Sequence, residues 1–253
     1  MIVTFLGTGT SQGVPVIGCD CHICRSLDFQ DKRLRSSIHI DVRGKSLVVD
    51  TGPDFRQQVL RERVKKLDAV LFTHAHKDHT AGMDDIRSYN FRQRTDMPIY
   101  GTVEVIDQLK QEFSYVFATK KYPGVPSVTV NHIDKSSFTI DDIEITPIEV
   151  MHYKLPVLGF RIDDFTYITD ANYISEEEMK KLEGTKHLVL NALQKEEHIS
   201  HFTLDEALEV IEKVKPEKAY LTHISHKLGK HRDVSRELPD NVVLAFDGLK
   251  IEC

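Results

Sequence analysis

The chain lacks any long hydrophobic segment. Its first residues, Met1 to Leu6, carry no basic charge, and no run approaches the roughly 20 apolar residues that a membrane-spanning helix requires. We therefore expect neither a signal peptide nor a membrane span. The sequence predicts a cytoplasmic protein with no membrane partner.

Basic residues are also in deficit, because 33 Lys and Arg stand against 39 Asp and Glu, a net charge of −6. Proteins that bind duplex nucleic acid usually carry a basic excess or a basic face. Solvated helix and loop surfaces explain the two short basic groups better than a nucleic-acid-binding surface does. The groups are Arg61, Arg63, Lys65 and Lys66, and Lys227, Lys230 and Arg232. We expect no stable nucleic-acid partner. The oligomeric state is open, with a homodimer as one option.

Cysteine is scarce, with four residues in the chain. A disulfide framework would spread its cysteines along a short secreted protein. Three of these four instead crowd together at Cys19, Cys21 and Cys24, and such a cluster more often binds a metal. Cys253 is expected to be a plain exposed thiol.

No segment rich in proline, glycine or serine divides the chain. A composition of 40% hydrophobic and 28% charged residues suits a globular protein, and we predict one domain over residues 1–253. The glycine-rich segment Gly7–Gly13 lacks the Gly-Lys-Ser/Thr ending of a P-loop and the spacing of a dinucleotide fingerprint. It is either a tight turn between strands or a loop beside a binding site.

Hydrophobic periodicity predicts strands separated by helices. The predicted strands cover 2–6, 36–42, 46–49, 67–73, 143–150, 159–162, 165–168, 188–190 and 219–222. The predicted helices cover 54–64, 103–117, a segment that opens at Ser175, and 203–214, which starts with the capping box Thr203-Leu204-Asp205-Glu206. Two mixed sheets with helices outside them satisfy this α/β pattern.

Four predicted strands end at residues that can bind a metal. The strand 67–73 runs into His74-Ala75-His76-Lys77-Asp78-His79, and later strands lead to His152, Asp170 and His223. Imidazole and carboxylate are ligands of zinc, manganese and related divalent ions. One isolated histidine is usually structural, but four such strand ends in one chain indicate a shared site.

This pattern, His-x-His-x-Asp-His followed by His, Asp and His, resembles the metallo-β-lactamase superfamily. The resemblance implies a four-layered αββα sandwich with two divalent metal ions, Zn or Mn, at one edge. It implies that Asp50 is a buried support for the ligand loop rather than a ligand. It assigns His74, His76 and His152 to one metal and Asp78, His79 and His223 to the second, with Asp170 bridging them.

The cysteine cluster resembles the PhnP branch of that superfamily, which comprises cyclic phosphodiesterases associated with phosphonate breakdown. The resemblance implies that Cys19, Cys21, Cys24 and His226 hold one structural zinc. A closed Cys3His site has no open coordination position, so its role would be stability. The alternatives are an iron–sulfur cluster and unbound reduced thiols. An iron–sulfur cluster would need a fourth iron ligand besides the three cysteines.

Hydrolysis of a phosphodiester also needs a proton donor for the leaving oxygen, a task that suits histidine. His201 matches the active-site histidine of the phosphodiesterase branches, so His201 and Asp78 are the predicted catalytic residues. The alternative for His201 is a solvent-exposed loop histidine. For His198 that loop interpretation is the favoured one. The segment after the ligand loop resembles a wall of the family site. There Arg87 would contact a phosphate and Tyr89 would stack on a base, although a helix surface with a buried tyrosine explains the segment equally well.

The sequence thus predicts an enzyme, a dinuclear metal-dependent phosphodiesterase for small substrates such as 2′,3′-cyclic or 1,2-cyclic ribosyl or nucleoside phosphates. Two metals about 3.5–4 Å apart would share the attacking hydroxide. The alternatives are a tRNA 3′-processing endonuclease, a glyoxalase II-like thioesterase and a non-catalytic metal-binding protein. Only residues 153–169 separate His152 from Asp170, which leaves no room there for the long basic arm with which tRNA-processing enzymes typically grip their substrate.

Overall fold

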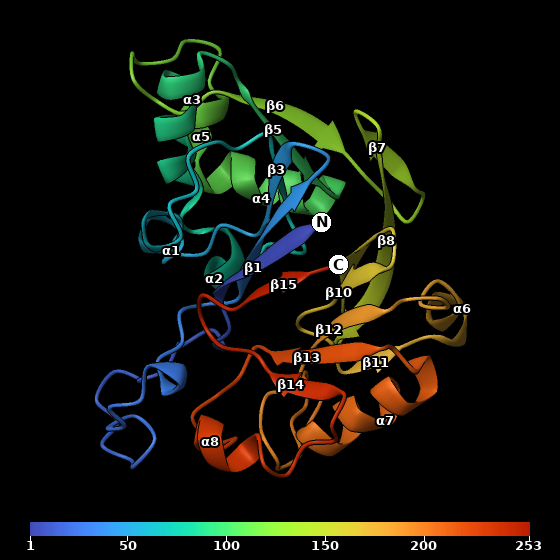
Figure 1. Cartoon of the computed structure of the whole chain (residues 1–253). Helices are drawn as coiled ribbons and strands as arrows, with labels where there is room; N and C mark the ends of the chain where they lie inside the picture. The colour runs from blue at the N-terminus through green and yellow to red at the C-terminus, as the bar shows by residue number, and fades with distance from the viewer.

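Two β-sheets pack face to face in the computed structural model, which describes residues 1–253 (Figure 1). The first sheet has seven strands in the order β15-β1-β2-β3-β4-β5-β6. Its four last strands, β3 to β6, run parallel to one another, so their carboxyl ends meet at one edge. The bounds are β1 Ile2–Gly7, β2 Ser37–Val42, β3 Lys45–Val49, β4 Ala69–Leu71, β5 Met97–Gly101, β6 Val128–His132 and β15 Lys250–Glu252.

The second sheet has eight strands, with the order β11-β8-β9-β10-β12-β13-β14 and β7 paired to β8. The long hairpin of β8 and β9 pairs His152 with Leu155 at its tip, and β10, β12, β13 and β14 are parallel. The bounds are β7 Phe138–Ile140, β8 Ile143–His152, β9 Leu155–Ile162, β10 Phe165–Tyr167, β11 Tyr173–Ile174, β12 His187–Asn191, β13 Lys218–Thr222 and β14 Val242–Leu244.

Helices cover the outer faces of both sheets. The first sheet carries α1 Phe55–Arg61, α2 Lys77–Thr80, α3 Arg87–Gln93, α4 Val103–Glu112 and α5 Ser114–Phe117, and the second carries α6 Glu176–Lys180, α7 Leu204–Val214 and α8 His231–Val234. Two 3-10 turns span Phe29–Asp31 and Met83–Ile86. None of these helices has the length and apolar character needed to cross a bilayer.

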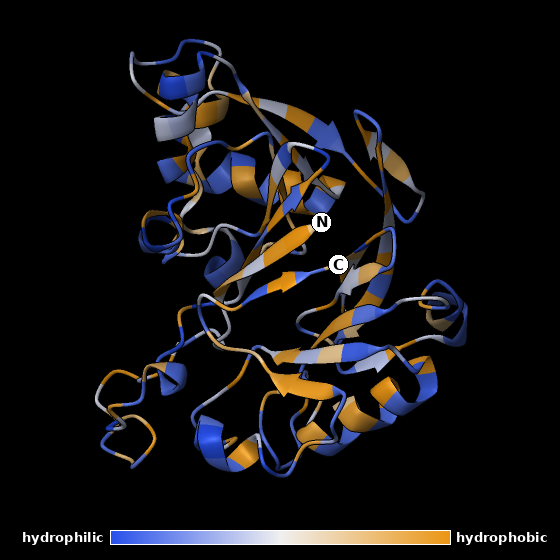
Figure 2. Cartoon of the chain, in the orientation of Figure 1, coloured by the Kyte–Doolittle hydropathy of each residue, from blue (hydrophilic) through white to orange (hydrophobic).

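Three apolar layers hold these elements together. The central layer lies between the sheets and includes Phe5, Val49 and Tyr167, all fully buried. The layer under α1 to α5 includes Phe55 and the layer under α7 includes Leu221. Hydrophobic and hydrophilic residues alternate along α7 accordingly (Figure 2). The predicted four-layered αββα sandwich is confirmed.

Most predicted elements are present, and the differences have local causes. The helix predicted at 54–64 ends at Arg61, and Arg63 then adopts a left-handed φ of 56°. The strand predicted at 67–73 is paired as a strand only over Ala69–Leu71, because the Gln93 side-chain amide occupies the backbone N–H and C=O of Leu67. The helix predicted at 103–117 breaks at Phe113 into α4 and α5.

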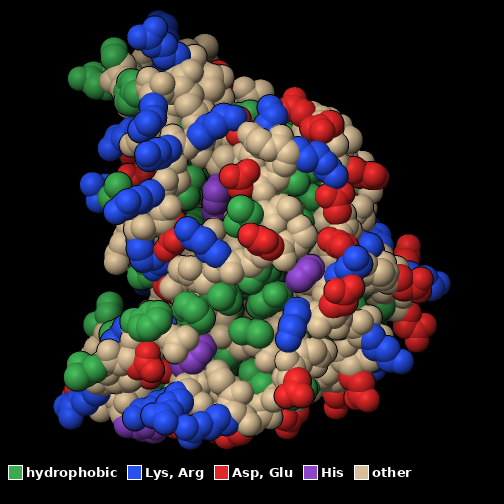
Figure 3. Space-filling view, viewed as in Figure 1, with side chains coloured by type: hydrophobic (Ala, Val, Ile, Leu, Met, Phe, Trp, Pro, Cys, Tyr) green, Lys and Arg blue, Asp and Glu red, His purple; other side chains and the backbone are tan.

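Charged side chains are unevenly distributed over this fold. Between residues 55 and 94, every charged residue that is exposed is basic: Arg56, Arg61, Arg63, Lys65, Lys66, Lys77, Arg87, Arg92 and Arg94. Figure 3 shows Lys and Arg gathered along the edge that carries α1 and α3. We call these nine residues the basic face. The remaining surface therefore carries an acidic excess, since the whole chain has a net charge of −6.

Candidate metal centre

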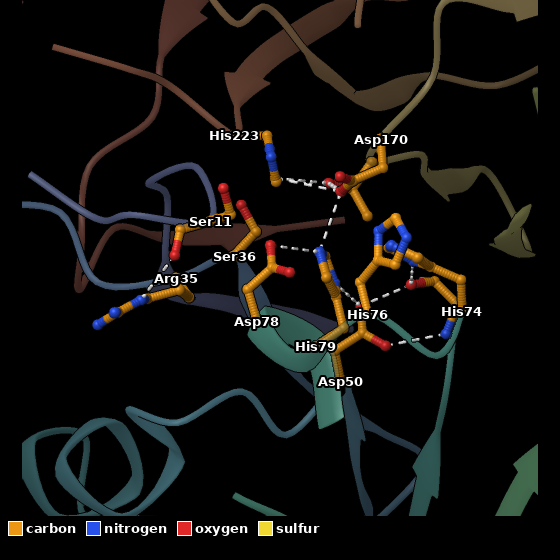
Figure 4. Close-up of polar contacts among 12 residues, drawn as sticks. Ser11, Arg35, Ser36, Asp50, His74, His76, Asp78, His79, Asp170 and His223 are labelled. Carbon is orange, nitrogen blue, oxygen red and sulfur yellow. Dashed lines mark hydrogen bonds and ion pairs between the residues drawn. The ribbon is translucent and has the colours of Figure 1, made fainter. Parts of the chain in front are cut away.

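The seven predicted ligands converge on one edge of the sandwich from both sheets. Figure 4 labels six of them, all except His152. In the first sheet, β4 leads into a short loop and α2, which present the His74 to His79 cluster. In the second sheet, β8 ends at His152, while Asp170 and His223 follow β10 and β13. The site therefore forms only when the two sheets pack together.

Backbone conformation at the strand ends is strained in a way that serves the site. Asp50, Asp170 and His223 all have left-handed φ angles, of 65°, 56° and 55°. Non-glycine residues seldom adopt this region, and such residues persist where the surrounding structure holds them. Here the left-handed turn ends each strand and redirects the chain at the metal-binding edge.

The ligand atoms form two groups, each with all its members within 4.8 Å of one another. One group contains His74, His76 and His152, and the other contains Asp78, His79, Asp170 and His223. His79 Nε2 lies 3.2 Å from a carboxylate oxygen of Asp78 and 3.2 Å from one of Asp170. Ligand atoms around one tetrahedral ion with bonds of about 2.0–2.2 Å lie roughly 3.3–3.6 Å apart. The second group therefore has the spacing of ligands to a common ion.

Buried nitrogen atoms without partners provide an independent test of metal binding. The Nε2 atoms of His74, His79 and His223 are buried and have no hydrogen-bond partner in the protein. A buried polar atom left unpaired costs about 1–3 kcal/mol. An ion held by the first group would satisfy His74, and an ion held by the second would satisfy His79 and His223, so the residues present fit the two metals that the superfamily implies.

Other side chains fix the orientation of these ligands. His79 Nδ1 donates to Asp50 Oδ2 at 2.7 Å, and the Thr73 N–H and hydroxyl both donate to the same carboxylate at 2.8 Å. His152 Nδ1 donates to the Ser200 carbonyl at 2.8 Å. Such contacts hold the ring so that its other nitrogen faces the metal. The expectation that Asp50 supports the ligand loop is confirmed.

The electrostatics of the second group suit a cation. Burial disfavours the charged form of His79. The negative charges of three nearby carboxylates outweigh the effect of burial and hold the pKa of His79 well above its ordinary value; they belong to Asp170, Asp50 and Asp78. Burial likewise works against ionised Asp170, yet His223 and His79 keep its pKa well below the usual range. Burial lowers the pKa of His74. The acidic surroundings that favour a proton on His79 would equally favour a bound divalent ion.

His201 lies against this centre, as the sequence predicts. Its ring centroid is 4.6 Å from that of His152 and 4.7 Å from that of His223, and its Nδ1 is 3.8 Å from Asp170. Burial, reinforced by the charge of His223, lowers the pKa of His201 to about 2. The sequence suggested a pKa near the working pH, so the structure corrects this part: the buried ring is neutral at pH 7. His198 lies beside it, with ring centroids 5.1 Å apart.

The four residues of the predicted structural zinc site come together as one cluster. Cys19, Cys21 and Cys24 each place Sγ 3.4 Å from His226 Nδ1. A tetrahedral ion with bonds of about 2.3 Å to sulfur and 2.0–2.1 Å to nitrogen sets these atoms roughly 3.5 Å apart. The backbone N–H of Cys24 lowers the pKa of Cys21 to about 6, whereas burial raises the pKa of Cys24 to about 11. The residues present fit one zinc ion.

Cys253 does not belong to this cluster. It is partly buried, and its backbone pairs with that of Met1. Burial raises the pKa of its thiol to about 12. The expectation of a plain exposed thiol was wrong because pairing between the two ends of the chain covers it.

The structure places the two predicted substrate contacts, Tyr89 and Arg87, in different environments. Tyr89 has an exposed fraction of only 6%, packs in the core beneath α1 to α5, and donates its hydroxyl to the Val64 carbonyl at 2.9 Å. The prediction that Tyr89 stacks on a base is therefore wrong, because its ring lies within the core. Arg87 is exposed and forms an ion pair with Asp84 at 3.2 Å. Its contact with a phosphate stays a prediction.

The glycine-rich segment lies beside the centre. Ile224, directly after His223, donates its N–H to the Thr8 carbonyl, and Thr10 donates to the Ile224 carbonyl. Of the two interpretations, the loop beside the binding site is therefore the observed one. Close packing explains the glycine at position 9, since a Cβ there would lie 2.9 Å from the Arg33 carbonyl.

Several supporting residues could not be identified from the sequence. Asn191 is buried and uses its side-chain amide to hold both backbone groups of Ala171, next to Asp170. Asn172 accepts from the N–H of Tyr153 at 2.7 Å, which fixes the turn after His152. Asn172 follows Asp170 by two positions, and that proximity is the one signal available. For Asn191 the sequence offered none.

Comparison with known proteins agrees with this geometry. Residues 45–224 match the model of the beta-lactamase superfamily domain. A crystal structure described as a new diphosphatase from the PhnP family superposes with a TM-score of 0.93 and 38% identity, and the match covers 100% of this chain and 97% of that one.

Curated relatives also match. An octanoyltransferase of Porphyromonas gingivalis is 37% identical over 97% of this chain and 50% of its own length. A ribonuclease Z of Bradyrhizobium diazoefficiens is 29% identical over 55% of this chain and 44% of its own. The chain spans about half the length of the curated relatives it matches. With the superfamily model covering most of the chain and the ligand pattern complete, the chain belongs to the metallo-β-lactamase superfamily of hydrolases and is PhnP-like within it.

Proposed function

We propose that the chain is a dinuclear-metal hydrolase of small molecules that contain a disubstituted phosphate, either a phosphodiester or a diphosphate. The observation that carries the proposal is the pair of adjacent ligand groups with His201 against them. The diphosphatase named for the PhnP-family structure supports the diphosphate as well as the diester. Both bonds join a phosphorus atom to a leaving oxygen, so they make the same demands on the site.

Two divalent ions, Zn or Mn, would supply charge neutralisation for the phosphate and activation of the attacking water. The protein residues do the rest. His74, His76 and His152 would hold one ion and Asp78, His79 and His223 the other, with Asp170 between them. The zinc held by Cys19, Cys21, Cys24 and His226 would be structural.

His201 lies against both ligand groups, so its ring would be close to a phosphate bound there. Its resting ring is neutral, so it donates through the nitrogen that carries its proton. A phosphate anion beside the ring stabilises the imidazolium form and thereby raises the pKa of His201. His201 thus protonates or hydrogen-bonds the leaving oxygen as negative charge develops there.

A substrate panel joined to metal analysis tests the proposal. The panel contains bis(p-nitrophenyl) phosphate, a 2′,3′-cyclic nucleotide, ADP-ribose as a diphosphate, and an octanoyl thioester. We expect turnover of at least one phosphate substrate, abolished by a chelator and restored by Zn or Mn. Turnover of the thioester alone would reject the proposal in favour of a thioesterase.

A matched pair of variants ties the activity to the metals. His76 and Lys77 are adjacent and both exposed, but only His76 belongs to a ligand group. We expect His76→Ala to lower activity by at least 100-fold and Lys77→Ala to change it less than about threefold. Equal activity of the two variants would support a non-catalytic role for the cluster.

RNA processing is a second candidate, favoured by the basic face and the ribonuclease Z relative. The connection between His152 and Asp170 argues against it, because it consists of a tight turn, β9 and β10 with no inserted arm. Cleavage of a precursor tRNA with a 3′ trailer, at rates above those for the small substrates, would establish the RNA function instead.

A further inference from the structure

A cavity of about 650 Å³ opens next to the metal centre. One wall comes from the start of α4, including Val103 and Glu104, and from the residues after β6, including Ile133. The other wall comes from the β8–β9 hairpin, including Leu155 and Leu158. Cavities of roughly 300–1,000 Å³ are typical of sites for small organic ligands.

The cavity is built onto the metal centre rather than merely near it. His74, a ligand of the first group, lines both. Leu155 pairs with His152 in the β8–β9 ladder, and Leu158 donates its N–H to the Thr73 carbonyl at 3.1 Å. Both walls are therefore fixed relative to the metals, so a phosphate at the metals would hold an attached group at the cavity mouth.

The lining selects for an uncharged, partly apolar group. Val103 and Leu155 leave 52% and 40% of their surface exposed and give the cavity part of its apolar lining. Three acids, Glu104, Asp134 and Glu149, line the cavity with a single base, Lys135. That lysine already pairs with Glu149 at 3.2 Å. A second phosphate in the cavity would meet uncompensated negative charge.

We propose that this cavity binds an uncharged organic group of nucleoside size that is attached to the scissile phosphate. This inference rests on the proposed phosphate-hydrolase function and adds its substrate class. The phosphate lies at the metals, and its neutral substituent occupies the space between α4 and the β8–β9 hairpin. Substrates with small substituents lose this contact, and substrates with a further phosphate in this position are disfavoured.

Nuclear magnetic resonance of the zinc-loaded chain tests the cavity without relying on catalysis, because the probe has no phosphate to hydrolyse. Thymidine serves as a neutral nucleoside probe. We expect it to shift the amide resonances of Val103, Ile133 and Leu155, and we expect Val103→Trp, which fills the cavity, to abolish those shifts. Leu60→Trp is the control, because Leu60 is equally exposed but lies on α1 outside the cavity. Absence of shifts in the wild-type chain, or shifts that survive Val103→Trp, would overturn the proposal.

Kinetics then separate the cavity from the proposed function. Thymidine 5′-(p-nitrophenyl phosphate) and methyl p-nitrophenyl phosphate share a leaving group and differ in the other substituent. We expect kcat/KM to favour the thymidine ester at least tenfold, Val103→Trp to remove that preference through the KM of the thymidine ester, and Leu60→Trp to retain it. Equal kcat/KM for both esters would reject the cavity and leave the hydrolase function standing. Turnover of neither ester would reject the phosphodiesterase form of the proposed function, and the thymidine resonances would still decide whether the cavity binds a nucleoside.

Discussion

Asp50 shows how one buried residue organises the candidate centre. Its carboxylate accepts three hydrogen bonds from the ligand loop, two from Thr73 and one from His79. Burial raises the pKa of Asp50, and contact with His79 counteracts that effect. The pair thus orients His79 and supports the basicity of its metal-facing nitrogen.

Asp50→Asn tests this support. The amide keeps the shape but loses the negative charge, so His79 becomes a weaker ligand. We expect metal affinity to fall roughly 10–100-fold, as for other residues that orient a ligand. Titration of metal-free protein with Zn measures it, with Asp41→Asn on the exposed surface of β2 as the control. An unchanged affinity in Asp50→Asn would contradict the assigned role.

His201 illustrates a residue whose position was predictable and whose ionisation was not. The capping box that starts α7 places it two residues before the N-cap Thr203, and the structure confirms that box. Its pKa depends on the walls around it, which come from β8, β10 and β13.

His201→Ala separates the two possible roles. If His201 donates to the leaving oxygen, the variant should lose at least 100-fold in kcat with an alkyl leaving group. It should lose less than about tenfold with p-nitrophenol, which needs little protonation. General acid–base residues typically contribute about 10²–10⁴-fold. Equal losses for the two substrates would indicate a structural role.

At the scale of elements, the segment between β1 and β2 is held by three anchors. The Cys3His cluster ties it to the segment after β13. The buried Arg33 donates to the Ala245 carbonyl at 2.6 Å and to the Thr8 hydroxyl at 2.8 Å. Asp31 accepts from the N–H of His231 at the start of α8. A segment with few core contacts thereby gains a fixed place beside the ligand loop.

Cys21→Ser tests the metal anchor. A serine hydroxyl is a poor zinc ligand, so we expect one metal per chain to disappear from elemental analysis and the melting temperature to fall. Cys253→Ser is the matched control, since it removes a thiol outside the cluster and should leave the metal content unchanged. Identical metal content in both variants would refute the structural zinc.

His231 adds a pH dependence to the same segment. Burial, with the charge of Arg33, lowers the pKa of His231 from 6.5 to about 4. Between pH 6.5 and 4, the imidazole of His231 is therefore protonated in the unfolded chain and neutral in the folded chain. Because the unfolded chain binds the extra proton, folding stability falls as the pH drops through this window. We expect His231→Asn to lose stability less steeply there than the wild type in urea unfolding. His132→Asn, at an exposed position, should follow the wild-type slope, and parallel slopes for all three proteins would contradict the assignment.

At the scale of the whole molecule, each of the two sheets carries a different part of the candidate site. The first sheet supplies the histidine cluster and the basic face, whereas the second supplies His152, Asp170 and His223. The cavity beside His74 has one wall on each sheet. The proposed catalysis and the proposed selection of the substrate would therefore both depend on the packing between the sheets.

The basic face gives a test that separates small substrates from RNA. Reversing two charges, Arg56→Glu with Arg92→Glu, weakens binding of a long polyanion because each neutralised phosphate contributes to affinity. We expect kcat/KM for small phosphate substrates to change less than twofold. Charge reversal on the acidic α7, Glu209→Lys with Glu212→Lys, is the control. A loss above tenfold confined to the first variant would favour the RNA candidate.

The sequence by itself predicted the candidate ligands, because a strand followed by His-x-His-x-Asp-His can be recognised from neighbouring residues and the family resemblance supplied the distant His152, Asp170 and His223. It also determined the capping box at Thr203, the hairpin of β2 and β3, and the cysteine cluster with its histidine partner. The tertiary structure decided the features that depend on contacts between distant segments. It buried Tyr89 beneath the helices, covered Cys253, lowered the pKa of His201 and formed the cavity between α4 and the β8–β9 hairpin. The physical reason is that ligand chemistry belongs to a residue and its spacing, whereas burial, ionisation and cavity shape belong to the surroundings that folding brings together.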